Sequence, residues 1–241
     1  MSAPGVVITV VLFDLDDTLF DHWASTRAAL ADLRRRFPAL DSLPVALVET
    51  EHRRLLEALH LRVLAGALTV DEARVERFRQ LLALAGRTAD GSAAAEAAAA
   101  YRAAYLAHWR PVEGALELLA AVHGRLATGV VTNNVAAEQR QKIVACGLGP
   151  HLDAVVISEE AGVTKPDPRI FRQALDALGC DAAAAVMIGD AWETDIAGAR
   201  AAGIRPVWFN RFGAASPDPS VTEIRALEPA ASVVSLIVTS A

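Results

Sequence analysis

Residues 6–20 read VVITVVLFDLDDTLF, a run of β-branched and other apolar residues that ends in three carboxylates. The apolar part is too short to span a membrane and predicts a fully buried strand. Asp14, Asp16 and Asp17 repel one another, so crowding them there stabilises nothing unless a cation or a reaction needs them. If the strand persisted, Asp14, Asp16 and Thr18 would share one face. The stretch therefore predicts a metal site.

Composition indicates a globular protein and sets limits on its partners. A chain of 241 residues can form one large domain or two smaller ones, and 53% of its residues are hydrophobic. The net charge of −6 and the lack of a basic stripe argue against nucleic-acid binding. No apolar run reaches the roughly 18 residues of a membrane span. We expect a cytoplasmic protein, monomeric or homodimeric, with no membrane partner. Cys146 and Cys180 lie far apart in sequence, which favours two buried free thiols over a disulfide but leaves a bridge between them open.

From residue 126 onwards, apolar segments of strand length alternate with amphipathic segments of helix length. This alternation predicts an α/β fold in which helices cover both faces of a parallel sheet. A further apolar run at 233–238 predicts one more strand. The expected strands are 126–132, 154–158, 184–188 and 206–209, and the expected helices are 136–145, 169–178 and 194–202.

Between the first strand and these later ones lies a block with helical periodicity and no strand pattern. Thr69 with Glu72 forms a capping-box signature, Asp90-Gly91-Ser92 predicts a turn, and Tyr101, Tyr105 and Trp109 form a stripe expected to pack between helices. The first strand must pair with strands after residue 125, so the block is an insertion. We therefore predict a core of residues 1–20 and 111–241 and a helical domain of 21–110, whose two linkers would let it close over a substrate.

Polar residues follow the core strands where the carboxyl ends of a parallel sheet meet, which is where such folds bind ligands. Lys165 is notable among them because the chain has only two lysines against 21 arginines. Carboxylates, a hydroxyl, amides and an ammonium are together what a phosphate and a divalent cation require. The residues are Asp14, Asp16 and Asp17 after the first strand, Thr132, Asn133 and Asn134 after the second, Lys165 after the third, and Gly189, Asp190 and Asp195 after the fourth.

These residues match, in order, the four motifs of the haloacid dehalogenase superfamily, which the chain resembles. The first motif, Asp-x-Asp-x-Thr, matches residues 14–18, and the second, a Thr or Ser ending a hydrophobic strand, matches Thr132. The third matches Lys165, and the fourth, a Gly-Asp followed by another Asp, matches Asp190 and Asp195. The resemblance implies a three-layer Rossmann-like core with an inserted, all-helical C1 cap.

The same resemblance implies a role for each site residue. Asp14 would be the nucleophile that forms an aspartyl-phosphate, and Asp16 the general acid and base. Mg²⁺ would bind Asp14, the backbone carbonyl of Asp16, and Asp190. Phosphoryl oxygens would be held by Thr132, the backbone of Asn133, and Lys165, with Thr18 and Asp195 in support. The role of Asp17 and of Asn134 stays open.

The expected activity is hydrolysis of a small phosphorylated metabolite, with a nucleotide or sugar phosphate favoured. Dehalogenases of the family generally lack an acid at the second Asp position, because a halide leaves without a proton, so Asp16 favours a phosphatase. Residues 16–20, 132–134 and 165–171 resemble the subgroup of pyrimidine 5′-nucleotidases and N-acylneuraminate-9-phosphatases. Two alternatives remain: a carbon-halogen hydrolase, and a non-hydrolytic receiver or binding protein, which the helical insertion and the order of the motifs disfavour.

Overall fold

The computed structural model describes residues 7–86 and 91–239, which fall into two compact units. The first unit, called the sheet unit here, comprises the chain up to Asp21 together with the chain from Arg110 onwards. The second, called the helical unit, is His22–Trp109. The two connecting segments run side by side within the sheet unit, because Phe20 bridges Pro111 and the amide of Asp21 donates to the carbonyl of Arg110 at 3.0 Å.

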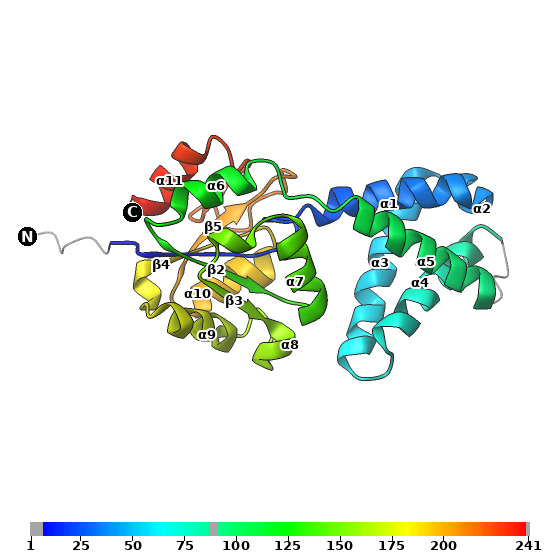
Figure 1. The fold of residues 1–241 in the computed structure, drawn as a ribbon, viewed down its shortest axis with the longest axis horizontal. Coiled ribbons are helices and arrows are strands. Elements are labelled where there is room, and N and C mark those ends of the chain that lie inside the picture. Colours follow the sequence, from blue (N-terminus) through cyan, green and yellow to red (C-terminus); the bar gives the residue numbers. More distant parts are fainter. Residues whose placement is uncertain (1–6, 87–90, 240–241) are drawn as a thin grey trace, which may run out of the picture. The chain divides into compact units, whose positions relative to one another are not determined.

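The sheet unit is built on six parallel strands in the order β3-β2-β1-β4-β5-β6 (Figure 1). Strand β1 is central, and its Val10 aligns with Ala127 on one neighbour and Ala185 on the other. The predicted parallel α/β core is confirmed. The strands are β1 (Val10–Phe13), β2 (Ala127–Thr132), β3 (Ala154–Ile157), β4 (Ala185–Gly189), β5 (Arg205–Phe209) and β6 (Thr222–Ile224).

Helices cover the two faces of this sheet (Figure 1). On one side, Ile170 and Phe171 of α9 pack into a buried cluster with Val10 and Leu12 of β1. On the other side, α6 contacts β2 and packs against α11. The helices of this unit are α6 (Ala115–Val122), α7 (Ala136–Ala145), α8 (Ser158–Ala161), α9 (Pro168–Leu178), α10 (Ala197–Ala201) and α11 (Ala230–Val238), with short 3₁₀ turns at Gly149–His151 and Ala182–Ala184.

Two predicted elements of the sheet unit were wrong or incomplete, and one strand was missed. Residues 233–238 are not a strand but part of helix α11, which follows Pro229 and buries Val233 and Ile237, one helical turn apart. The helix expected at 194–202 is a π-helical turn, Trp192–Ile196, followed by α10. Strand β6 was missed because three residues are too few to show a period of two.

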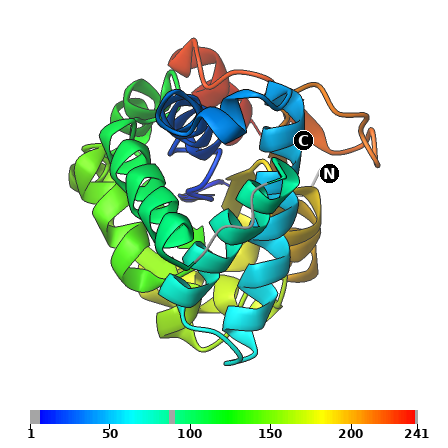
Figure 2. The ribbon, with the colours of Figure 1, turned by 90° about the vertical axis from the view of Figure 1, so that its right-hand side faces the viewer.

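The helical unit contains α1 (His22–Arg36), α2 (Pro38–Asp41), α3 (Val45–Leu64), α4 (Val70–Leu84) and α5 (Gly91–Ala107). Helix α5 packs against α1 and α4, and α4 packs against α3 (Figure 2). Tyr101 of the aromatic stripe packs between helices as predicted, since it is buried and its ring lies 5.0 Å from that of Phe78 on α4 and 4.9 Å from that of His52 on α3. Gly91 begins α5, so the predicted turn does not extend to Gly91 and Ser92, and Asp90 lies outside the described residues.

Two further expectations from composition can be compared with the structure. Cys146 and Cys180 are both free thiols, the favoured alternative, but only Cys146 is buried as expected, since Cys180 is half-buried. Within residues 7–86 and 91–239, no helix is both long enough and apolar enough to cross a bilayer.

The capping box at the start of α4 is present in full and makes the first prediction. The Glu72 amide donates to Thr69 Oγ1 at 3.2 Å, and the Thr69 amide donates to Glu72 Oε2 at 2.7 Å. Thr69→Ala removes the side-chain acceptor, so we predict a loss of about 1 kcal/mol of stability in urea unfolding followed by circular dichroism. Thr69→Ser keeps the acceptor and is the control; equal losses in both variants would contradict the role of the cap.

Candidate active site

The carboxyl ends of β1 and β4 lie side by side at the centre of the sheet, where the strand order reverses. Asp14 directly follows β1, and its amide donates to the carbonyl of Ile188 at 2.9 Å. Asp190 directly follows β4. The sheet topology thus places two carboxylates, 176 residues apart in sequence, at one point of the fold.

Lys165 is the buried centre of this group. Its Nζ lies 2.5 Å from Asp14 Oδ1 and 2.7 Å from Asp195 Oδ1, and the lysine side chain is only 2% exposed. Burial alone would lower the pKa of Lys165, but Asp14 and Asp195 together raise it above its ordinary value. Lys165 is therefore a permanent cation held against Asp14.

The acidic side of the group carries more negative charge than one lysine can balance. Carboxylate oxygens of Asp14, Asp190 and Asp195 lie within 4.8 Å of one another. Burial raises the pKa of Asp14 to about 7 despite the opposing effect of Lys165, and burial and the charge of Asp14 raise that of Asp190 to about 9. These groups would need protons or a cation in order to lie so close, and their hard oxygen donors suit a divalent metal ion.

Asp195 is held by its own loop as well as by Lys165. It lies on the π-helical turn, its Oδ2 accepts the amide of Ala191 at 3.0 Å, and its Oδ1 faces Lys165. Gly189 permits this approach, because a Cβ at that position would lie 2.6 Å from Asp195 Cγ. Both oxygens of Asp195 are thus engaged, which suits a residue that orients Lys165 better than a direct metal ligand.

The segment after β2 holds the backbone of Lys165. Asn133 forms a two-way amide pair with it, accepting the Lys165 amide at 2.8 Å and donating to the Lys165 carbonyl at 3.1 Å. The hydroxyl of Thr132 is buried nearby and accepts a hydrogen bond from Gln139 Nε2 at 2.8 Å. The Asn133 side chain therefore fixes the backbone of Lys165, which the sequence did not reveal. The sequence had led us to expect only a contact between the Asn133 backbone and the phosphate.

Asp16 has two partners that the sequence analysis missed. Gln139 Nε2 donates to its Oδ2 at 2.9 Å, and Lys142 Nζ donates to its Oδ1 at 2.7 Å. Both partners lie on α7 and are almost completely buried. The rarity of lysine, which drew attention to Lys165, would have identified Lys142 by the same reasoning.

The turn after Asp16 leaves the strand direction, so the expected common face of Asp14, Asp16 and Thr18 does not form through a continued strand. Strand β1 ends at Phe13, and Asp17 has a left-handed φ of 61°. Thr18 is nevertheless buried at the site, with its hydroxyl 3.4 Å from Asp190 Oδ1. Asp17 lies 3.9 Å from the guanidinium of Arg211.

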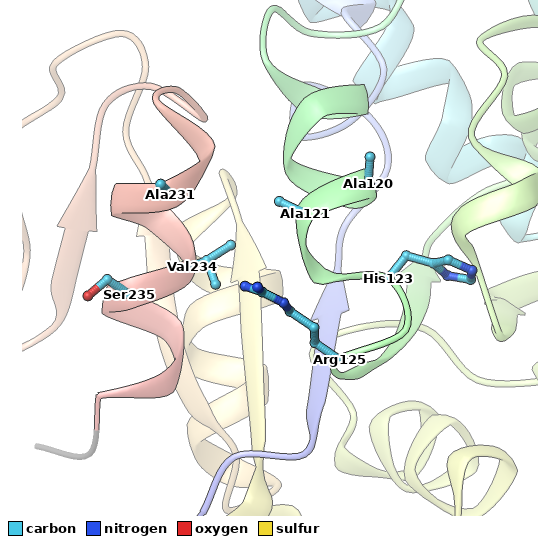
Figure 3. A pocket seen from close by; sticks show the side chains of 7 residues that line it. All are labelled: Ala120, Ala121, His123, Arg125, Ala231, Val234 and Ser235. Carbon is cyan, nitrogen blue, oxygen red and sulfur yellow. The ribbon is translucent and has the colours of Figure 1, made fainter.

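A cavity of about 550 Å³ lies away from this group, between α6 and α11 (Figure 3). Its lining includes Arg125 and His123, which precede β2 and so lie at the amino ends of the strands. None of the predicted site residues lines it. The cavity is therefore at the amino ends of the strands, whereas Asp14, Lys165 and Asp190 are at their carboxyl ends.

The family assignment follows from a comparison with known proteins. A family model described as haloacid dehalogenase-like hydrolase matches residues 8–203. The chain belongs to this family. The predicted family and the prediction of a hydrolytic enzyme are thereby confirmed.

Relatives agree with this assignment over nearly the whole chain. Phosphoserine phosphatase of Thermus thermophilus is 35% identical over 90% of this chain and 96% of its own. N-acylneuraminate-9-phosphatase of Rattus norvegicus is 28% identical over 91% of this chain and 93% of its own. The magnesium-bound structure of the HAD hydrolase YfnB from Bacillus subtilis aligns with a TM-score of 0.73 and 27% identity, over 95% of this chain and 99% of that one.

The crowded carboxylates make a prediction about pH and stability. Asp14 and Asp190 have higher pKa values in the folded protein than in the unfolded chain, so the folded state binds more protons. Stability of the metal-free protein should therefore fall as pH rises from about 5 to about 9. In EDTA at pH 8, we predict that Asp190→Asn melts at least roughly 3 °C above the unsubstituted protein, because it removes one buried negative charge.

The measurement is thermal unfolding in EDTA, and in MgCl₂, at several pH values. Magnesium should raise the melting temperature of the unsubstituted protein most at the alkaline end, where the carboxylates are ionised, and should have little effect on Asp190→Asn. The prediction fails if both proteins show the same dependence of melting temperature on pH.

Proposed function

We propose that this protein is a Mg²⁺-dependent phosphomonoester hydrolase that works through an aspartyl-phosphate on Asp14. The observation that carries the proposal is the buried arrangement of Asp14, Lys165 and Asp195 beside Asp190. A carboxylate held against a permanent cation, with further acidic oxygens alongside, provides a nucleophile and a place for a metal-bound phosphate.

In the first step, a carboxylate oxygen of Asp14 attacks phosphorus and the bond to the leaving alkoxide breaks. Asp16, in its protonated form, gives a proton to that alkoxide. The Thr132 hydroxyl, the Asn133 backbone amide and Lys165 bind the phosphoryl oxygens and offset their charge. The products of this step are the free alcohol and an acyl phosphate on Asp14.

In the second step, a water molecule attacks the phosphorus of the aspartyl-phosphate. Asp16, now a carboxylate, takes a proton from that water, and the bond between phosphorus and the Asp14 oxygen breaks. Inorganic phosphate leaves, Asp14 is again a carboxylate and Asp16 is again protonated. The same side chain therefore acts as acid and then as base.

Mg²⁺ would be held by the carboxylates of Asp14 and Asp190 and by the backbone carbonyl of Asp16. When bound, it supplies charge neutralisation and orients a phosphate oxygen. The hydroxyl of Thr18 donates a hydrogen bond to Asp190, and the carboxylate of Asp195 orients Lys165. Thr18 and Asp195 therefore support the site without contacting the substrate.

The presence of Asp16 supports a phosphatase over a carbon-halogen hydrolase. An alkoxide leaving group needs a proton and a halide does not, and Asp16 supplies a carboxyl two residues from the nucleophile. Two relatives that align over 90% and 91% of this chain are a phosphoserine phosphatase and an N-acylneuraminate-9-phosphatase. We propose a small phosphorylated metabolite as the substrate, with nucleotides, sugar phosphates and phosphoserine as the first compounds to test, and the helical unit as the cap that selects among them.

Substitution of the nucleophile tests the covalent mechanism. Asp14→Asn keeps the shape of the side chain but not its charge, so we predict a fall in kcat of roughly 10³-fold or more on any phosphomonoester, and EDTA should abolish the activity of the unsubstituted protein. Phosphate release with excess MgCl₂ is the measurement. Asp176→Asn, on the exposed side of α9, is the matched control and should keep full activity. A folded Asp14→Asn protein with unchanged turnover would exclude the covalent step.

The proton-transfer role of Asp16 predicts a dependence on the leaving group. Asp16→Ala should lower kcat by roughly 10²-fold or more on an alkyl phosphate, whose alkoxide needs a proton, and by much less on p-nitrophenyl phosphate. Steady-state rates on the two esters give the comparison. Equal losses on both would remove Asp16 from the acid role.

A further inference from the structure

The chain has only two lysines, and each contacts one aspartate of the first motif. Lys165 lies against Asp14, as described above. Lys142, on α7, lies against Asp16, although its side chain is just 1% exposed. A buried ammonium is costly unless it is paired, so the position of Lys142 calls for an explanation.

Lys142 and Gln139 hold Asp16 between them. Lys142 Nζ contacts Oδ1 of Asp16 at 2.7 Å, and Gln139 Nε2 contacts Oδ2 at 2.9 Å. The two partners are bonded to each other, since Lys142 Nζ donates to Gln139 Oε1 at 2.9 Å. They are three residues apart on one helix and so share a face. Each oxygen of Asp16 therefore has its own donor.

The group also connects Asp16 to the phosphate-binding side of the site. Gln139 Nε2 contacts Thr132 Oγ1 at 2.8 Å as well as Asp16. Lys142 Nζ lies 4.9 Å from the centroid of the Phe20 ring and 3.6 Å from Glu138. The buried amide of Gln139 thus fixes the positions of the Asp16 and Thr132 side chains relative to each other, although these two residues follow different strands.

We propose that Lys142 and Gln139 are positioning residues that hold the Asp16 carboxyl in place for proton transfer to and from the substrate. The inference rests on the proposed function of Asp16. Neither residue itself transfers a proton or a phosphoryl group; both act through Asp16, and Gln139 also acts through Thr132.

Stability alone does not account for Lys142. The Asp16 side chain is 26% exposed, so water can solvate its carboxylate if the lysine is removed. An apolar side chain of similar length in the place of Lys142 would avoid the cost of burying an ammonium. Positioning accounts for the lysine, because a displacement of about 1 Å at a proton-transferring group can cost on the order of 10²-fold in rate.

The experiment compares Lys142→Met with the unsubstituted full-length protein on two esters. We expect kcat on an alkyl phosphate to fall roughly 10-fold to 100-fold and kcat on p-nitrophenyl phosphate to fall less than about 3-fold, with little change in KM. The melting temperature should stay the same or rise. Arg140→Met is the matched control, since Arg140 lies on the same helix in an exposed ion pair with Glu160, and it should behave as unsubstituted protein on both esters.

A double-substitution cycle shows whether the effect passes through Asp16. In an Asp16→Ala background, Lys142→Met should cause no further loss on the alkyl phosphate, because there is no carboxyl left to position. Gln139→Leu provides a second variant if Lys142→Met does not fold; it should lower kcat on both esters, because Gln139 also holds Thr132, but clearly more on the alkyl phosphate. Lys142→Arg should recover part of the rate, because it restores a cationic donor.

Other outcomes overturn the inference. Equal losses on both esters, additive losses in the Asp16→Ala background, or a lower melting temperature with an unchanged leaving-group dependence would each make Lys142 a structural residue. These results differ from failure of the proposed function itself, in which the unsubstituted protein would hydrolyse neither ester and the cycle would have no starting rate.

Discussion

The ion pairs of Lys165 with Asp14 and Asp195 are the interaction on which the rest of the site depends. One buried ammonium lies between two carboxylates, with a third carboxylate, that of Asp190, close by. The group is stable only if its charges are balanced, so the site is matched to a cation and to the transfer of an anionic group. The surrounding strands and loops hold these four charged side chains at fixed distances from one another.

The arrangement of the sheet accounts for those distances. The adjacent parallel strands β1 and β4 end at the same level, which brings Asp14 and Asp190 together at the carboxyl ends of the strands. The π-helical turn then returns the chain so that Asp195 reaches Lys165, and Gly189 leaves the room for it. The segment after β2 fixes the backbone of Lys165 through Asn133. Three separate segments thus converge on one lysine, and none of them could form the site alone.

A second lysine supports the second aspartate in a comparable way. Asp14 faces Lys165, which lies between α8 and α9, and Asp16 faces Lys142 on α7. Two carboxyls only two residues apart therefore have separate cationic partners. This separation matches the two tasks proposed for them, because a nucleophile and a proton donor need different orientations. Gln139 joins the two halves through Thr132.

The sequence by itself determined strands β1 to β5 and the family, and it indicated that Asp14, Lys165, Asp190 and Asp195 meet at the carboxyl ends of the strands, because periodicity and short motifs are local properties of the chain. Prediction from local properties was wrong where tertiary packing determines the structure: the apolar run at 233–238 was predicted as a strand but is part of helix α11, which packs against α6. The partners of Asp16 and the side-chain task of Asn133 were also beyond local inference. Each depends on a contact between segments far apart in sequence, and only the folded sheet unit sets which buried donors reach which carboxylates.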